Sequence, residues 1–323
     1  MIYFRLPFSE NICTIEENSP ETPVSFFSFD GSKKLDFKGK IEQLSRENFT
    51  KLQITIDEIS TDLSDFSPED QTDYEDKIGK VIHFVQENNL SKLVLSRLKL
   101  KKYDGSKIDF VESFLKLCDQ FPGAFAYVFI QDGKCWMGAF SEVLGDFNKK
   151  TFEFKTMSLA GTLPLNEDWT TKEIQEQKTV TDFVSKTLES FSANVKQSEV
   201  SDHISGNIKH LRTDFTAEIQ ADEVEELIKN LHPTPAVCGI PKDICKSAIE
   251  NFEKFPRDLY AGYIRIETPE SIKYFVNLRC AEFFTNAALI HVGGGITAQS
   301  SPEKEWQETE LKAEAILKNI VLM

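Results

Sequence analysis

Two hydrophobic patterns divide residues 67–323 into predicted helices and strands. Apolar residues recur every three to four positions over residues 72–88, 109–120, 170–190, 221–230 and 242–255, and again after Pro302, which predicts helices there. A capping box supports the first of these helices, since Glu75 follows Thr72 by three residues, and Thr170-Thr171-Lys172-Glu173 opens the third. Alternating patterns and turn residues predict hairpins over residues 123–140, 141–162 and 259–279, and two strands over residues 191–220.

The order of these elements favours one fold class. The hairpins are interspersed with helices, and the sequence has no regular strand–helix–strand repeat. We therefore predict an α+β fold in which large antiparallel sheets are covered by helices. Residues 1–66 contain only short apolar pieces, such as Ser25–Phe29 and Leu52–Ile56, and are predicted to be short strands and loops packed on the main body formed by residues 67–323, in a single domain overall.

The predicted strand over residues 92–97 begins with a lysine in an apolar setting. Alternation places Leu93 and Leu95 on one face, and Lys92, Val94 and Ser96 on the other. One interpretation is an edge-strand lysine that blocks unwanted strand pairing. The other is a functional lysine.

The stretch over residues 290–312 contains the densest candidate chemistry. A strand-like run ends in Gly293-Gly294-Gly295, and Ser300 or Ser301 can cap a following helix. On that helix Glu305, Glu308 and Lys312 share one face. Glycines let a ligand approach the backbone and leave N–H groups for an anion, while paired carboxylates suit a hard cation such as Mg²⁺. The alternative is a glycine-rich loop followed by an ordinary solvated helix.

Other polar residues lie where a structural role and a functional role are both plausible. Glu142 follows an apolar hairpin, where its carboxyl would be partly desolvated. Glu173 and Glu176 are three residues apart on a predicted helix, so they are either a cation site or a solvated face. Arg279 lies among apolar neighbours and needs an anionic partner, whereas a single histidine such as His210 is usually a satisfied core residue.

Composition excludes several classes of function. The 323 residues carry a net charge of −15, which argues against a nucleic-acid or anionic-membrane surface. No apolar run has the length of a membrane span, and the first residues do not resemble a signal peptide. The six cysteines form no CxxC motif, so free thiols in a reducing cytosol are the simplest expectation.

Taken together, these motifs resemble those of the chorismate-utilising enzymes, and among them most closely the isochorismate synthase branch. The matching pieces follow the order of the family and span roughly residues 67–323. They are Lys92-Leu93-Val94-Leu95-Ser96-Arg97, Gly138-Ala139-Phe140-Ser141-Glu142-Val143-Leu144, Leu159-Ala160-Gly161-Thr162, residues 172–177, residues 232–239, Leu278-Arg279-Cys280, Gly293-Gly294-Gly295-Ile296 and Glu305-Trp306-Gln307-Glu308-Thr309. Two departures are Ser141, where proline is usual, and the triple glycine, where Gly-Ala-Gly is common.

This resemblance implies a fold of two large antiparallel sheets stacked between helical layers, and Mg²⁺-dependent conversion of chorismate to isochorismate. It implies that Lys92 is the base that activates water for attack at ring C2, and that Glu142 is the acid that protonates the departing C4 hydroxyl. Glu176 and Glu308 match the Mg²⁺ ligands, with Glu305 assisting. The implied substrate-binding residues are Gly161, Thr162, His210, Val237, Cys238, Gly239, Arg279, Gly293, Gly294, Gly295 and Lys312.

The resemblance also implies a cytoplasmic, monomeric enzyme whose product enters menaquinone or siderophore synthesis. Three alternatives stay open at this stage. Salicylate synthases use the same base and acid and then eliminate pyruvate. The aminodeoxychorismate-forming branch keeps a lysine at the position of Lys92. A catalytically silent binding subunit on the same fold is the third.

Overall fold

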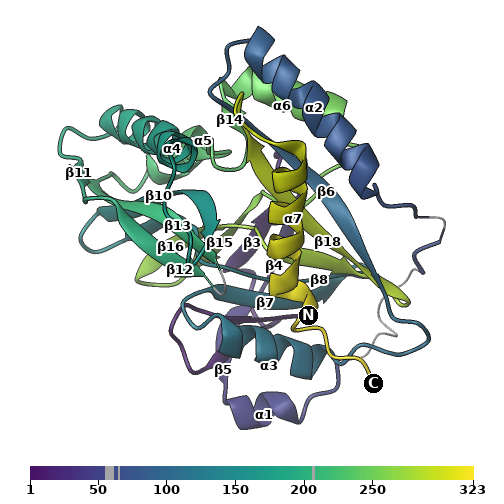
Figure 1. Cartoon of the computed structure of the whole chain (residues 1–323). Coiled ribbons are helices and arrows are strands. Elements are labelled where there is room, and N and C mark those ends of the chain that lie inside the picture. The colour runs from purple at the N-terminus through teal and green to yellow at the C-terminus, as the bar shows by residue number, and fades with distance from the viewer. Residues whose placement is uncertain (55–61, 65, 206–207) are drawn as a thin grey trace.

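The computed structural model describes residues 1–54, 62–64, 66–205 and 208–323. The end of the predicted apolar piece Leu52–Ile56 lies outside these residues. Two nine-stranded sheets dominate the described part of the chain, and all of their strand pairings are antiparallel (Figure 1). The prediction of an α+β fold with large antiparallel sheets is confirmed.

The first sheet places the strand of Lys92 beside the strand of the three glycines. Its order is β14 (Gly239–Ile240), β6 (Lys92–Lys102), β18 (Ala287–Ile296), β17 (Cys280–Phe283), β8 (Lys134–Phe140), β7 (Phe125–Gln131), β1 (Ile2–Arg5), β2 (Ile12–Glu16) and β5 (Lys40–Leu44).

The second sheet contains the other predicted hairpins. Its order is β11 (Lys196–Gln197), β13 (Ile208–Glu218), β10 (Glu153–Pro164), β9 (Val143–Asn148), β16 (Ser271–Val276), β15 (Tyr263–Glu267), β3 (Val24–Phe27) and β4 (Lys34–Phe37), and β12 (Ser201–Ser205) also pairs with β13. Residues 191–220 therefore contribute three strands, β11, β12 and β13, rather than the predicted two.

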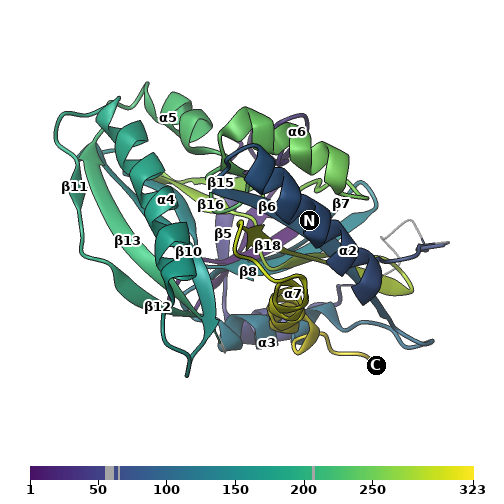
Figure 2. The ribbon, with the colours of Figure 1, turned by 45° about the horizontal axis from the view of Figure 1, so that its top comes forward.

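Helices cover the outer faces of the sheets (Figure 2). Helix α4 (Thr171–Glu189) lies on β10 and β13, and α5 (Val224–Leu231) lies beside α4. Helices α2 (Gln71–Glu87), α6 (Lys242–Phe252) and α7 (Pro302–Leu317) lie near β6 and β18, while α1 (Arg46–Thr50) and α3 (Phe110–Gln120) lie at the other end of that sheet. No helix in the described ranges is both long enough and apolar enough to cross a membrane.

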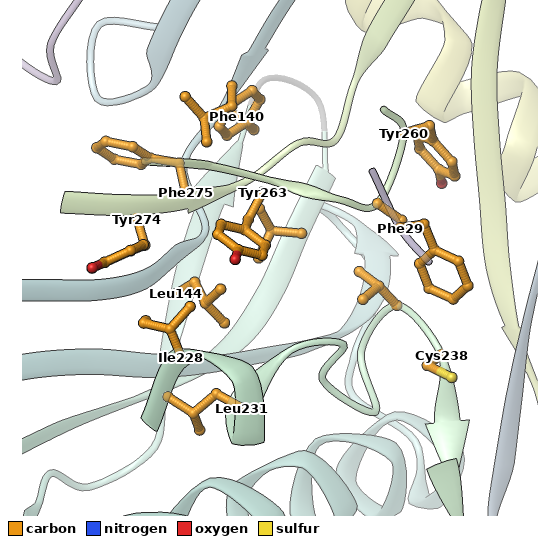
Figure 3. Packing of buried hydrophobic residues seen from close by; sticks show 14 of the residues in the cluster. Phe29, Phe140, Leu144, Ile228, Leu231, Cys238, Tyr260, Tyr263, Tyr274 and Phe275 are labelled. Atoms are coloured by element: carbon orange, nitrogen blue, oxygen red, sulfur yellow. The ribbon is translucent and has the colours of Figure 1, made fainter. Parts of the chain in front are cut away.

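The main hydrophobic core lies between the two sheets (Figure 3). Phe125 from the first sheet stacks on Phe275 from the second with 4.8 Å between ring centres. Phe26 on β3 meets Tyr127 on β7 at 4.9 Å, so the N-terminal strands contribute to this core. Burying a phenylalanine stabilises a fold by about 1.5–3 kcal/mol, and this layer therefore supplies a large share of the stability.

Residues 1–54 are built into both sheets. Strand β1 pairs with β7, and β3 pairs with β15. The predicted apolar piece Ser25–Phe29 is therefore largely strand β3 of the second sheet, whereas residues 52–54 belong to no helix or strand.

Candidate active site

A cleft of about 860 Å³, part of it open to solvent, is bordered by residues from both sheets and from helices α4 and α7. Most of the predicted site residues line it, although they come from distant parts of the chain. They are Lys92, Glu142, Gly161, Thr162, Glu176, His210, Val237, Arg279, Gly293, Gly294, Gly295 and Lys312. Glu308 lines an adjoining pocket that shares Thr162 and Lys312 with the cleft.

Lys92 is a buried lysine with one carboxylate partner. It is the first residue of β6, its exposure is 2%, and its Nζ donates to Oε1 of Glu176 at 2.7 Å. Strand β6 has β14 on one side and β18 on the other, so Lys92 does not lie at a free edge. The edge-strand interpretation of this lysine is therefore wrong, because Lys92 points into the cleft between the sheets.

Glu142 lies between β8 and β9, and its exposure is 5%. Burial raises the pKa of Glu142 to about 7, although the Lys92 ammonium opposes that change. A carboxyl group with such a pKa is largely protonated just below neutral pH, which suits a general acid.

A second polar group in the cleft is centred on Arg279. Its NH2 group donates to Nε2 of His210 at 3.0 Å, and its NH1 group donates to the hydroxyl of Ser205. Nδ1 of His210 lies 3.0 Å from the carbonyl oxygen of Gly161 and donates to it. This assigns the imidazole a fixed neutral tautomer, and burial lowers its pKa well below the ordinary value.

The three glycines are strand residues, which excludes the alternative of a glycine-rich loop. Gly293, Gly294 and Gly295 continue β18 and pair in register with Ser96, Leu95 and Val94 of β6. Their lack of side chains brings other groups close. A Cβ atom on Gly295 would lie 2.4 Å from Cε of Lys92, and one on Gly294 would lie 3.0 Å from Oε2 of Glu305.

Three carboxylates around the cleft each pair with one lysine. Besides the pair of Lys92 with Glu176, Nζ of Lys172 donates to Oε1 of Glu305 at 2.9 Å, and Nζ of Lys312 donates to Oε1 of Glu308 at 2.7 Å. Lys312 also donates to the carbonyl oxygen of Gly293 at 3.0 Å. The predicted metal ligands are thus compensated by nearby cations.

Burial and charge act differently on these carboxylates. Burial raises the pKa of Glu305 to about 7, with a further contribution from Glu308, and Lys172 opposes both. Burial would raise the pKa of Glu176 as well, but the ammonium groups of Lys92, Lys172 and Lys312 outweigh it, so that pKa lies below its ordinary value.

The chemistry of these groups fits a hard divalent cation. Oε2 of Glu305 is buried and has no hydrogen-bond partner, and Oε1 of Glu308 borders the same space above Gly294. Within the described ranges, no three His, Cys, Asp or Glu side chains converge as a ready-made metal cage. Mg²⁺ usually keeps several waters and binds through one or two carboxylates together with an anionic substrate, so two converging carboxylates are sufficient.

Two candidate residues do not line the cleft. Cys238 and Gly239 do not line it, because their backbone pairs with β6: the Cys238 carbonyl accepts from the Val94 N–H at 2.9 Å, and Gly239 lies opposite Leu93. Their placement in the cleft wall is therefore corrected, and Val237 is the lining residue of that loop. Glu173 is the capping-box partner of Thr170, and it borders the adjoining pocket rather than the cleft.

Three residues of the site were not identified from the sequence. Tyr260 and His291 line the cleft, and their rings stack at 5.3 Å. His291 could have been found, because it precedes Gly293 by two residues and so shares its strand face. Lys172 lies in the motif over residues 172–177, but its ion pair with Glu305 on a distant helix has no local sequence signal.

Comparison with known proteins agrees with this geometry. The sequence profile of the chorismate binding enzyme family matches residues 28–321. Isochorismate synthase DhbC of Bacillus subtilis is 28% identical over 272 residues, which cover 76% of this chain and 67% of that protein. Isochorismate synthase EntC of Escherichia coli is 27% identical over 264 residues, which cover 77% of this chain and 67% of that protein. A chloroplastic isochorismate synthase of Catharanthus roseus is 38% identical over 113 residues, and only 20% of that longer protein is covered.

Solved structures share the fold over nearly the whole chain. A putative 2,3-dihydroxybenzoate-specific isochorismate synthase from Bacillus anthracis superposes with a TM-score of 0.80 at 23% identity, covering 98% of this chain and 95% of that chain. The menaquinone-specific isochorismate synthase MenF of Escherichia coli gives 0.79 at 18% identity, covering 98% and 88%. With its fold, its cleft and its sequence profile in agreement, the chain belongs to the family of chorismate binding enzymes.

Proposed function

We propose that this protein converts chorismate to isochorismate in a Mg²⁺-dependent reaction. The observation that carries the proposal is that one buried lysine, Lys92, and one buried carboxyl group, Glu142, line the same cleft. Relatives named isochorismate synthase, matched over three quarters of this chain, support it. The product would enter menaquinone or siderophore synthesis.

The two residues have complementary tasks in this reaction. Lys92, as the free amine, accepts a proton from the water whose oxygen bonds to ring C2. As the ring double bonds shift, the C4–oxygen bond breaks, and Glu142 gives its proton to the departing hydroxyl, which leaves as water. Solvent then restores the starting protonation states of both residues. General acid–base catalysis of this kind contributes about 10²–10⁴-fold for each group.

The cations of the cleft suit a substrate with two carboxylates. Arg279 borders the cleft, and its donors toward His210 and Ser205 fix its orientation. Lys312 lies beside Gly293 and supplies a second cation. Holding both carboxylates of the substrate would place the ring between Lys92 and Glu142, and such positioning is worth several kcal/mol in enzymes.

Glu308 and Glu176, with Glu305 assisting, would hold the Mg²⁺. When bound, the ion would offset the charge of the carboxylates and polarise a substrate carboxylate. The lysines paired with these carboxylates would then be free to meet the substrate.

The test is incubation of purified protein with chorismate, with and without Mg²⁺, followed by chromatographic separation of the products. We expect isochorismate only with Mg²⁺, in a mixture that approaches equilibrium with chorismate. Salicylate and pyruvate would instead assign the protein to the lyase branch, and an aminated product formed with ammonia would assign it to the amino-transferring branch. If chorismate is not converted under any of these conditions, the protein would instead be a catalytically silent binding subunit.

A further inference from the structure

Arg97 is a buried cation that lies outside the cleft. Its side chain is 1% exposed, and it follows Lys92 on β6 by five residues. Because side chains alternate along a strand, the two residues lie on opposite faces of the sheet. Lys92 points into the cleft, whereas Arg97 points toward α7. A buried arginine is costly unless its donors are satisfied.

The guanidinium of Arg97 is held by groups from α7 and α2. Its Nε donates to Oγ1 of Thr309 at 2.9 Å, and its NH2 group donates to the carboxylate of Glu310. Its central carbon lies 3.8 Å from the centre of the Trp306 ring and 5.5 Å from that of Tyr74. Arginine suits this setting because its planar fork can stack on a ring and donate hydrogen bonds at the same time.

The α7 residues that Arg97 contacts are the chain neighbours of the candidate metal ligands. Trp306 follows Glu305, and Thr309 follows Glu308. Because a helix moves as a rigid unit, the contacts of Arg97 with Trp306 and Thr309, which we call the Arg97 clamp, also fix the positions of Glu305 and Glu308 on the same helix. The space available to those glutamates is narrow, since a single added Cβ on Gly294 would lie 3.0 Å from Oε2 of Glu305.

We propose that Arg97 is a positioning residue for the divalent-cation site. Its contacts hold α7 against the face of β6 opposite Lys92, and this fixes the positions of Glu305 and Glu308 and thereby the affinity for Mg²⁺. The inference rests on the proposed function only in taking these two glutamates as cation ligands. Groups that orient metal ligands without touching the metal typically change metal affinity by about 10–100-fold when they are replaced.

Lys99 provides a matched control. It also pairs with Glu310, at 2.5 Å, but it is 25% exposed, and it has no hydrogen bond or ring contact with Thr309 or Trp306 among the described interactions. Replacing Lys99 therefore removes an ion pair to α7 without releasing the clamp.

The experiment is calorimetric titration of the intact protein with Mg²⁺ alone, comparing the wild type with Arg97→Lys, Thr309→Val and Lys99→Met. Arg97→Lys keeps the charge but loses the fork and the ring stacking, so we expect its Kd for Mg²⁺ to rise about 10–100-fold. Thr309→Val removes the hydroxyl that accepts from Arg97 and donates to the carbonyl oxygen of Trp306, but it keeps the ring stacking and the Glu310 contact of Arg97, so its Kd should rise by a smaller factor. Lys99→Met should stay within about twofold of the wild type.

Turnover of chorismate at saturating Mg²⁺ supplies the second readout. Lys92 and Glu142 are untouched in these variants, so raising the Mg²⁺ concentration should restore kcat for Thr309→Val to within about threefold of the wild type. Wild-type Mg²⁺ affinity in both Arg97→Lys and Thr309→Val would overturn the inference, as would a loss of kcat that Mg²⁺ does not restore. If Arg97→Lys does not fold, Thr309→Val decides alone.

The outcome for the wild type separates the two proposals. A wild type that binds Mg²⁺ but leaves chorismate unchanged would overturn the proposed reaction and leave the role of Arg97 intact. A wild type that binds no Mg²⁺ would overturn the role of Arg97 together with the metal dependence of the reaction.

Discussion

The ammonium of Lys92 lies 2.7 Å from Oε1 of Glu176, although the two residues are 84 positions apart and belong to different layers of the fold. Strand β6 supplies the lysine and helix α4 supplies the carboxylate. The candidate base is thus ion-paired with a candidate metal ligand. It must give up that ammonium proton before it can accept one from water.

Replacing this lysine separates its two roles. Lys92→Met should reduce kcat for isochorismate formation by about 10²–10⁴-fold, because the general base is lost. Its Mg²⁺ affinity should be equal to or tighter than that of the wild type, because Glu176 no longer has a competing cation. Lys77→Met is the control, since Lys77 on α2 forms a similarly buried pair with Glu69 and does not line the cleft. Full turnover by Lys92→Met would exclude the proposed base.

The raised pKa of Glu142 predicts a pH dependence of activity. As an acid it must be protonated, and burial sets its pKa at about 7 despite the opposing Lys92 charge. Its contribution to kcat/KM should therefore be complete below about pH 6 and decrease as the pH rises above 7. Lys92 must lose a proton to act as the base, which changes kcat/KM in the opposite direction, so the limb due to Glu142 is measured on the residual activity of Lys92→Met. Between about pH 6 and 9 the kcat/KM of Lys92→Met should fall as the pH rises above 7, and a kcat/KM of that variant that rises steadily would contradict the assignment.

The same carboxyl group predicts a pH-dependent effect on stability. Its folded pKa is higher than that of an unfolded glutamate, so the stability that it contributes at low pH is lost as the pH rises from about 4.5 to 7. Glu142→Gln cannot ionise. The unfolding free energy of Glu142→Gln minus that of the wild type should therefore be up to about 3 kcal/mol larger at about pH 8 than at about pH 4.5. The variant should also lose catalytic activity. Urea unfolding at both pH values measures this, and an equal difference at the two pH values would contradict it.

The glycine triplet predicts a contrast between neighbouring substitutions. Gly294→Ala should cost little stability but weaken Mg²⁺ binding, because the added methyl would lie 3.0 Å from Oε2 of Glu305 and displace a candidate metal ligand. Gly293→Ala should destabilise the protein by about 1–3 kcal/mol, because its methyl would lie 2.6 Å from the fixed carbonyl oxygen of Leu95. Thermal unfolding and Mg²⁺ titration of the two variants make the comparison. Equal effects of the two substitutions would show that the strand adjusts more freely than its pairing suggests.

Features set by local chemistry could be predicted from the sequence. The shared face of Glu305, Glu308 and Lys312 follows from helical geometry, because all three lie within the single helix α7. The start of α4 at Thr170 could be predicted in the same way, and there Thr170 and Glu173 form a capping box. The turn at residues 132–133 likewise joins β7 to β8 as expected. The capping box predicted at Thr72 and Glu75 is wrong, because Asp70 caps α2 instead.

Features set by distant partners could not be predicted. Three successive glycines favour a loop, but pairing with β6 keeps residues 293–295 in a strand. Cys238 and Gly239 matched a wall motif, yet backbone pairing to β6 turns them away from the cleft. The pair of Lys172 with Glu305 joins residues 133 positions apart, and no local pattern encodes it.

The placement of β18 between β6 and β17 has a consequence for synthesis on the ribosome. Strand β6 ends at Lys102, and its long-range partner begins only at Ala287, so about 185 residues must be translated before the two can pair. At elongation rates of roughly 5–20 residues per second, β6 remains without this partner strand for about 10–40 s. The nascent chain therefore has to avoid aggregation for that time, and the cleft is completed only after β18 has left the ribosome.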